Sequence, residues 1–243
     1  MGEGQKIVFD RIVRWDGIED NESIGALFFH VFIKQLITNV YGDEFALLCD
    51  GYLDAYMSLK YLTHRKIREL FTTGESLWLD DIKTKKKSER LDDMILSSLK
   101  GSYNYIVENY GENKSNWKWG DAHALTHRHV LSKVKILDYL FSLNVGPFKS
   151  GGSSLTPNAG GYSFRDGFKQ TSGASMRRIV DFSDLNRTKM ILPTGQSGLH
   201  KSINYKDQAE LYHSGGYRTT RFYESYIRRS IEFDHLRFLP NSQ

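Results

Sequence analysis

The sequence predicts an α+β protein in which a mainly helical region, residues 1–119, precedes a mixed region of loops, short strands and short helices, residues 120–243. All four prolines, at positions 147, 157, 193 and 240, fall in the second region. Because proline costs ~3 kcal/mol inside a helix, its absence permits long helices in the first region. Seven glycines between positions 146 and 173 indicate turns and close backbone approaches in the second.

The first expected helix spans Ile24–Tyr41 and follows several candidate N-cap residues in Asp20–Ser23. Its residues are apolar around most of the circumference. The polar residues His30, Lys34 and Thr38 recur every four positions and form one narrow stripe. A helix with this pattern is expected to be buried over most of its surface.

Two further helices are expected before the second region. One runs from Tyr52 to Phe71 and ends near Gly74. The other begins at Ser88, a good cap, carries acidic residues in its first turn where the helix dipole favours them, and ends at Gly111. One face of this helix is apolar and consists of Leu91, Ile95, Leu99, Ile106 and Tyr110.

The second region favours a short antiparallel hairpin. Residues 176–182 and 189–192 contain β-branched and large apolar side chains, and the polar residues 183–186 lie between them. A short helix is expected over 205–212, and 222–231 is compatible with either a helix or a strand.

Composition excludes several classes of protein. Apolar residues make up 40% and charged residues 26% of the 243, which is typical of a globular chain and not of a disordered one. The single cysteine, Cys49, excludes an internal disulfide framework, and its apolar neighbours predict a buried, inert thiol. The sequence contains no stretch of 18 uncharged apolar residues, so no membrane span is predicted. Met1–Gln5 lacks the pattern of a signal peptide.

Charge gives no indication of a nucleic-acid partner. The net charge is −3 over residues 1–119 and +7 over residues 120–243, which sums to the overall +4. The strongest basic cluster, Lys83–Lys87, has acidic residues on both sides and no interleaved aromatic residues, so we interpret it as a solvated loop. Three histidines, His123, His127 and His129, lie within seven residues, and Asp121 is adjacent. A zinc site would still need a third ligand, and the preceding Trp119-Gly120 and the basic Arg128 are not typical of a zinc-binding helix. They are predicted to be structural, and no metal site is predicted.

No catalytic or cofactor-binding residue can be assigned by spacing alone. Ser197 lies between two glycines, as in a nucleophile elbow, but Leu199 replaces the closing glycine and no alternating α/β pattern surrounds it. The glycine pairs at 151–152 and 160–161 lack the lysine and helix start of a phosphate-binding loop. A self-sufficient serine hydrolase that used Ser197 would need a histidine and an aspartate within reach.

A series of short blocks runs from about Arg11 to Phe222. Their residues, called the motif residues below, include Trp119, Gly120, His123, His129, Asn158, Gly160, Arg177, Gly195, Gln196, Ser197, Gly198, Asp207 and Gln208. In this order the blocks resemble the penicillin acylase (penicillin amidase) family of N-terminal-nucleophile hydrolases. The match is to the C-terminal part of that family's β chain, and Asn204, His127 and Val130 depart from the usual family pattern.

The resemblance implies an amide-hydrolysing enzyme with a four-layer αββα core, to which strands of residues 120–243 would contribute. Such enzymes are made as long precursors that cleave themselves and expose a serine at the start of the β chain. The α-amine of that serine, with a pKa of ~7.7–8.0, acts as the general base. Neither this serine nor its oxyanion-stabilising asparagine block has a counterpart here, and the family's calcium ligands lie upstream of the matching region.

The chain is therefore expected to be a C-terminal fragment or separately expressed part of such an enzyme, with a structural role and no activity alone. Its expected partners are the upstream part of the same precursor, a small amide substrate of the parent, and further copies of itself. The parent is expected to be exported to the periplasm or secreted. An independent binding module without catalytic activity is the alternative, and the sequence does not choose between β-lactam amides, acyl-homoserine lactones and other substrates.

Overall fold

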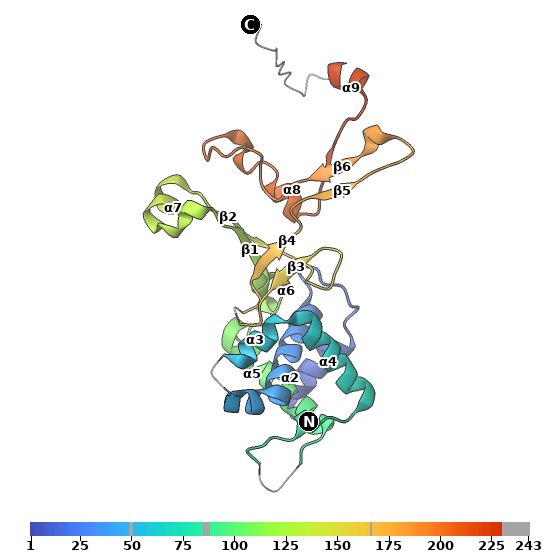
Figure 1. Cartoon of the computed structure of the whole chain (residues 1–243), viewed down its shortest axis with the longest axis vertical. Helices are drawn as coiled ribbons and strands as arrows, with labels where there is room; N and C mark the ends of the chain where they lie inside the picture. The colour runs from blue at the N-terminus through green and yellow to red at the C-terminus, as the bar shows by residue number, and fades with distance from the viewer. Residues whose placement is uncertain (49–50, 85–87, 166, 230–243) are drawn as a thin grey trace. The chain divides into compact units, whose positions relative to one another are not determined.

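A computed structural model describes residues 1–48, 51–84, 88–165 and 167–229, and it confirms a mixed helical and β architecture (Figure 1). The helices are α1 (Glu3–Val13), α2 (Ile24–Leu48), α3 (Tyr52–Ser58), α4 (Lys60–Thr73), α5 (Leu91–Tyr110), α6 (Trp119–Ala122), α7 (Lys135–Phe141), α8 (Ala209–His213) and α9 (Glu224–Arg229). The strands are β1 (Ala124–His127), β2 (Val145–Lys149), β3 (Gly160–Tyr162), β4 (Gln170–Gly173), β5 (Arg177–Ile179), β6 (Lys189–Ile191) and β7 (Arg218–Thr219). Short 3-10 turns include η1 (Leu77–Leu79), η3 (Val130–Lys133) and η5 (Ile203–Tyr205).

The chain forms two compact units that interleave along the sequence. Unit 1 consists of residues 1–127 and 146–173, and unit 2 of residues 128–145 and 174–243. The change in composition at residue 119 therefore marks a change in secondary structure, whereas the compact units have other boundaries. Unit 1 continues past residue 119 because strand β4, within residues 160–173, pairs with β3 on one side and with β1 on the other.

Unit 1 is built around α2, which packs against α1, α3, α5 and α6. The Ser23 hydroxyl accepts a hydrogen bond from the Ala26 amide at 3.2 Å, which confirms an N-cap at the predicted position. The helix continues to Leu48, seven residues beyond the expected end, since its C-terminal part is covered by α3 and η1. In length and composition α2 would also suffice to cross a membrane, but most of its apolar window is buried inside unit 1.

The other helical predictions need three corrections. The helix expected over Tyr52–Phe71 is two helices, α3 and α4, because the backbone leaves helical geometry at Leu59, where ψ is 57°. The end at Gly74 is confirmed, with a left-handed φ of 72°. Helix α5 begins at Leu91 rather than Ser88, and the Asp93 carboxylate accepts the Arg90 amide at its start. Helix α1 was not predicted; a Gln5 side chain ties it to the Leu96 carbonyl of α5.

A four-stranded sheet completes unit 1, with strand order β2-β1-β4-β3. Strands β1 and β4 run parallel, with Leu125 opposite Gln170. Strands β3 and β4 are antiparallel, with a bulge between Gly161 and Tyr162. The bulge precedes Tyr162, whose side chain is buried in the core of unit 1.

Unit 2 contains the predicted hairpin. Strands β5 and β6 pair in antiparallel fashion with Arg178 opposite Met190, and β7 extends the sheet beyond β6. The helix expected over 205–212 is shorter: η5 is followed by helix α8, from Ala209. Within 222–231 the chain is helical as α9, and residues 230–231 lie outside the described part.

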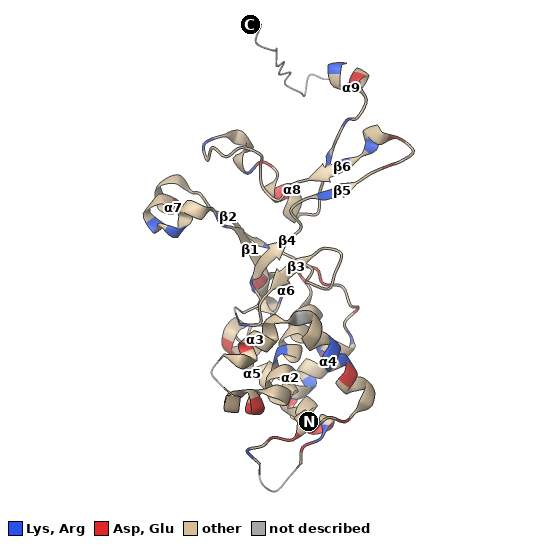
Figure 2. Cartoon of the chain, viewed as in Figure 1, with Lys and Arg blue, Asp and Glu red and all other residues tan. Residues whose placement is uncertain are grey.

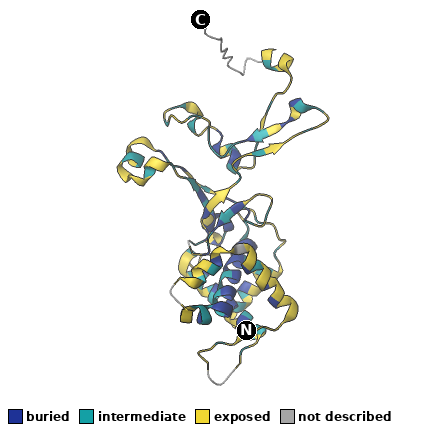
Figure 3. Ribbon diagram, viewed as in Figure 1, coloured by how far each residue is buried: buried dark blue, intermediate teal, exposed yellow. Residues whose placement is uncertain are grey.

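Burial differs between the two units (Figure 3). Unit 1 has a continuous buried core of α1, α2, α5 and α6 side chains. In unit 2 the hairpin residue Ile191 is fully buried, but Ile179 of the facing strand is 52% exposed. Large apolar side chains of unit 2 are strongly exposed, including Val130, Ile136, Tyr139, Leu140, Phe182, Leu199 and Ile203.

Helix α4 carries basic side chains and one acidic residue, Glu69, and β5 and β6 also carry basic side chains (Figure 2). In the basic run at 83–87, the Thr84 hydroxyl donates to the Glu89 carboxylate at 2.9 Å. Lys85–Lys87 lie outside the described residues, as does Cys49, so their predicted roles stay predictions.

Candidate functional site

The motif residues of unit 1 surround a stack of three buried rings. His30 of α2 lies against Trp119 with ring centroids 4.3 Å apart, and Trp119 lies against His123 at 4.6 Å. The interplanar angles are 20° and 10°, so the three rings are nearly parallel. None of the three is more than 1% exposed. Trp119 of α6 therefore lies between His30 of α2 and His123, the residue that ends α6.

Polar partners hold both ends of this stack. Glu19 Oε1 lies 3.2 Å from His30 Nε2, and the Tyr162 hydroxyl lies 2.8 Å from His30 Nδ1. At the other end, His123 Nδ1 lies 2.8 Å from the Phe168 carbonyl oxygen. A proton on Nε2 would face Glu19, and Nδ1 could then accept from the tyrosine hydroxyl.

The electrostatics of this cluster favour an ionised Glu19. Burial raises the pKa of Glu19, but the hydrogen bond from His30, with a contribution from Ser153, outweighs it and leaves the pKa below its ordinary value. Burial also raises the pKa of Tyr162, with a further contribution from the Glu19 charge, so the phenol stays protonated. A neutral phenol can donate to His30, which is the role that its distance indicates.

The glycine-rich loops of the sequence close around the same stack. The Trp119 indole donates to the Gly152 carbonyl at 2.9 Å, and the Asn158 side chain donates to the Gly151 carbonyl at 3.2 Å. A Cβ at Gly160 would lie 2.6 Å from His123 Nε2, so only glycine allows β3 to pass this close to the ring. The motif residues Trp119, Gly120, His123, Asn158 and Gly160 thus belong to one assembly, in which the Gly120 amide donates to Asn21 O at 2.8 Å.

A second group of motif residues organises unit 2. Arg177 donates to the Tyr212 carbonyl at 2.8 Å and its guanidinium lies 3.9 Å from the centre of the Tyr212 ring. The buried Gln208 side chain accepts the Leu192 amide at 3.2 Å, and Asp207 forms an ion pair with Arg218 at 3.0 Å. These contacts tie the hairpin to α8 and β7.

The loop of residues 195–198 is fixed by its backbone. The Gly195 amide donates to Tyr205 O at 2.9 Å and the Ser197 amide to Asn204 O at 3.1 Å. A Cβ at Gly195 would clash with the Asn204 carbonyl, so this position also requires glycine. Gln196 and Gly198 are exposed on the same loop.

Ser197 does not have the environment of a nucleophile. Its hydroxyl oxygen accepts the Leu199 amide at 3.1 Å, as in a local turn. Among the described residues, no histidine or aspartate is hydrogen-bonded to this hydroxyl. The nucleophile-elbow interpretation therefore has no geometric support.

The three histidines of residues 123–129 do not converge. His123 is in the buried stack, the His127 ring lies 6.4 Å from that of Phe148, and His129 Nδ1 accepts the Leu131 amide at 3.1 Å. Burial lowers the pKa of His127. Over the part of the chain that the structure describes, no group of three or more His, Cys, Asp or Glu side chains is arranged to hold a metal ion.

Sequence reasoning missed three members of the buried cluster, namely Glu19, His30 and Tyr162. The pattern of α2 did contain a signal, because His30 interrupts a helix that is otherwise expected to be buried. A buried histidine needs polar partners, but sequence spacing could not identify partners 11 and 132 residues away.

The fold is α+β, and the motif residues hold its loops in place and pack against one another in the buried ring stack. A model of the penicillin amidase family matches residues 2–229, and the chain belongs to that family. The family resemblance expected from the motif residues is confirmed.

Curated relatives in Pseudomonas are named acyl-homoserine lactone acylase QuiP. The protein of Pseudomonas syringae pv. syringae is 24% identical over 87% of this chain and 26% of its own length. The protein of Pseudomonas aeruginosa is 23% identical over 96% of this chain and 29% of its own length, and that of Pseudomonas putida is 21% identical over 95% and 28%, respectively. The chain therefore spans about a quarter of the length of these relatives.

Proposed function

We propose that this chain is the structural C-terminal part of an amidohydrolase whose nucleophilic serine lies in the rest of a longer precursor. The main support is that the family match extends over residues 2–229 while the matched region amounts to about a quarter of its relatives. The motif residues of the chain hold loops, rings and strands in place, as a scaffold that supports a reactive centre would require.

In the proposed reaction, an N-terminal serine attacks the carbonyl carbon of a linear amide. Its own α-amine accepts the hydroxyl proton and then delivers a proton to the departing nitrogen. Cleavage of the C–N bond releases an amine and leaves an acyl ester on the serine. Water then hydrolyses that ester to a carboxylic acid and regenerates the serine. The contribution of this chain is to complete an αββα core with its strands.

We propose an N-acyl-homoserine lactone as the substrate of the complete enzyme, by analogy with the names of the relatives. The bond that breaks would be the amide between the fatty acyl group and the lactone amine. Export of the parent to the periplasm or beyond is part of the same proposal.

Exposed apolar side chains in unit 2 support the proposal that another protein surface packs against this unit. Phe182 is 91% exposed, Ile203 87% and Tyr139 86%. Apolar surface of this kind is costly in water and marks a region that another protein surface covers. The remainder of the precursor is the partner we propose.

The first test is the activity of the purified 243-residue chain. N-decanoyl-homoserine lactone and a chromogenic phenylacetyl amide are incubated with the chain, and released amine is measured. We expect no release above the blank for the wild type or for Ser197→Ala. Hydrolysis that disappears in Ser197→Ala would establish a self-contained serine hydrolase and refute the proposal.

The second test concerns the coding region in front of the codon for Met1. The proposal expects that region to encode the remainder of an acylase precursor. Expressed in one piece with this chain, it should cleave itself and release amine from the lactone substrate. An unrelated preceding region would contradict the proposal and favour an independent binding module.

A further inference from the structure

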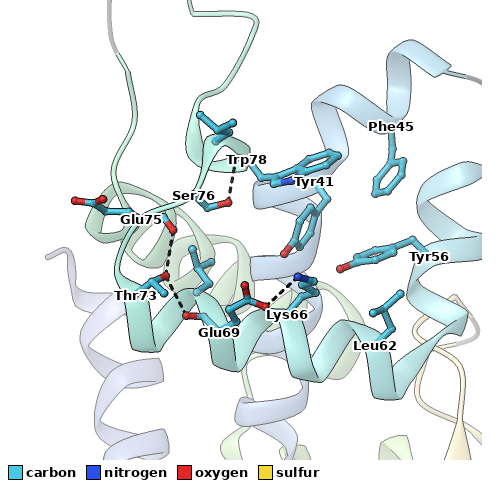
Figure 4. A pocket seen from close by; sticks show the side chains of 12 residues that line it. Tyr41, Phe45, Tyr56, Leu62, Lys66, Glu69, Thr73, Glu75, Ser76 and Trp78 are labelled. Atoms are coloured by element: carbon cyan, nitrogen blue, oxygen red, sulfur yellow. Dashed lines mark hydrogen bonds and ion pairs between the residues drawn. The ribbon is translucent and has the colours of Figure 1, made fainter.

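A second feature of unit 1 lies among residues that carry no family motif. A pocket of about 450 Å³ opens between the C-terminal half of α2, α3, α4 and η1 (Figure 4). A volume of this size is within the range of small-molecule sites, about 300–1,000 Å³. None of the motif residues lines it.

Four aromatic side chains form one wall of the pocket in a closed ring of contacts. Tyr41 contacts Tyr56 and Trp78, with ring centroids 5.0 and 5.4 Å apart. Phe45 contacts the same two rings at 5.2 and 5.9 Å. Trp78 is 42% exposed, and its neighbour Leu77 at the mouth of the pocket is 95% exposed. Such an aromatic surface, open to water, favours a flat apolar ligand.

Hydrogen bonds hold the mouth of the pocket in place. The Thr73 hydroxyl donates to the Glu75 carbonyl at 3.1 Å, just where α4 ends. The Ser76 hydroxyl accepts the Trp78 amide at 3.3 Å, which fixes η1. Beyond η1, the buried Asp43 carboxylate accepts the Ile82 amide at 2.9 Å and ties the segment back to α2. The aromatic wall is therefore preorganised, which reduces the entropy lost on binding.

The polar end of the pocket consists of an ion pair and two phenols. Lys66 Nζ lies 2.9 Å from Glu69 Oε2, one turn apart on α4. The hydroxyls of Tyr41 and Tyr56 point toward this pair in Figure 4. Burial raises the pKa of both tyrosines, so each hydroxyl keeps its proton and can both donate and accept.

The ion pair constrains the charge of a ligand. An anionic head group near Lys66 would also face Glu69, and a cationic head group near Glu69 would also face Lys66. Glu75 also lines the pocket, but its carboxylate points away from this pair in Figure 4. Because the charges of Lys66 and Glu69 already neutralise each other, neither kind of ion gains a clear advantage. An uncharged group that can donate and accept hydrogen bonds can use both partners without separating them.

We propose that this pocket binds an uncharged aromatic molecule of about the size of a substituted indole, with its hydrogen-bonding group at the Lys66–Glu69 pair. The ring packs on Trp78 and Tyr56, and the head group remains near water because both charged side chains are about half exposed. This site contains no nucleophile and its role is binding.

The test compares three ligands that share one ring and differ in the charge of the head group. Indole-3-acetamide, indole-3-acetate and tryptamine are titrated into the purified chain by isothermal calorimetry at pH 7.5. We expect the amide to bind at least about fivefold more tightly than either ion. Equal affinities for all three, or no binding of the amide, would overturn the proposal.

Variants test where the ligand binds and how the charges of Lys66 and Glu69 determine the preference between ligands. Trp78→Ala is expected to weaken binding of the amide by about tenfold or more, as truncation of a central aromatic contact does. Phe71→Ala is the matched control, because Phe71 is on α4 and 47% exposed but does not line the pocket. Lys66→Met should shift the preference toward tryptamine, and Glu69→Gln toward indole-3-acetate. An unchanged preference in both charge variants would refute the charge argument.

A competing occupant is a second copy of the chain. If Trp78→Ala abolished self-association in sedimentation velocity while the wild type bound no indole compound, the pocket would be an interface and the ligand proposal would be wrong. Because these experiments measure binding and not hydrolysis, a negative result would leave the amidohydrolase proposal intact.

Discussion

Replacement of Glu19 is the most direct test of the buried cluster in unit 1. Its carboxylate lies 3.2 Å from His30 Nε2, and the two side chains are 8% and 1% exposed. Removing the acceptor of a buried N–H group typically costs about 1–3 kcal/mol, because the donor stays buried without its partner. We therefore expect Glu19→Leu to lower the free energy of unfolding by about 2 kcal/mol at pH 7.

Glu19→Gln separates the charge from the hydrogen-bonding geometry. The glutamine carbonyl oxygen can still accept from His30, so the loss is limited to the difference between a charge-assisted and a neutral hydrogen bond, about 1 kcal/mol. Glu22→Gln is the control in the same loop. Glu22 pairs with Lys118, but the two side chains are 57% and 34% exposed, so the expected loss is below about 1 kcal/mol.

The measurement is urea unfolding, followed by tryptophan fluorescence because Trp119 stacks directly on His30. The pKa of Glu19 is lowered in the folded protein, so its stabilisation is fully present above the unfolded value of about 4.3. It is lost as the pH falls through the lower folded pKa. The stability gap between wild type and Glu19→Gln should accordingly shrink below about pH 4. A Glu19→Leu variant as stable as wild type, or a gap that widens on acidification, would refute the assignment.

Three further predictions concern glycine packing, the unit 2 network and exposed apolar residues. Gly160→Ala should lower the free energy of unfolding by about 1–3 kcal/mol in urea, since its Cβ would meet His123, whereas Gly198→Ala, with open space around its Cβ, should have little effect. Arg177→Lys should cost about 1 kcal/mol through the lost contacts with Tyr212, measured by thermal unfolding against the exposed control Arg178→Lys. Phe182→Ser, at a 91% exposed position, should change stability by less than about 0.5 kcal/mol while reducing self-association of the chain in sedimentation velocity.

The sequence predicted features that depend on local chemistry. The caps at Ser23 and Gly74 and the antiparallel hairpin of β5 and β6 were found where side-chain patterns placed them. Features that depend on tertiary packing were missed. The break at Leu59 has no proline or glycine to signal it, and α2 extends to Leu48 because other elements cover its end.

The buried cluster shows why motif recognition gave only part of the site. Trp119, His123 and Gly160 could be recognised as family positions, yet nothing in their spacing indicated that a histidine from α2 completes the stack. The packing of α2 brings His30 to Trp119. Glu19 is held nearby because its carbonyl oxygen accepts a hydrogen bond from the Gly152 amide. Contacts between residues so far apart in the sequence depend on the tertiary fold, so the spacing of the motif residues could not indicate them.

The contrast between the two units bears on how the chain would act in a larger enzyme. Unit 1 has a continuous core, and its ring stack is held by polar contacts of His30 with Glu19 and Tyr162 and of His123 with the Phe168 carbonyl, as a stable scaffold requires. Unit 2 buries Ile191, Ala209 and Tyr212 but exposes residues as apolar as Phe182 and Ile203. Its small three-stranded sheet buries few apolar side chains, since Ile191 of β6 is buried but Ile179 of β5 is 52% exposed. We therefore expect unit 2 to show weaker amide protection than unit 1 in hydrogen exchange of the isolated chain. That difference should diminish once the rest of the proposed precursor covers its apolar residues. Equal protection in both units of the isolated chain would contradict this expectation.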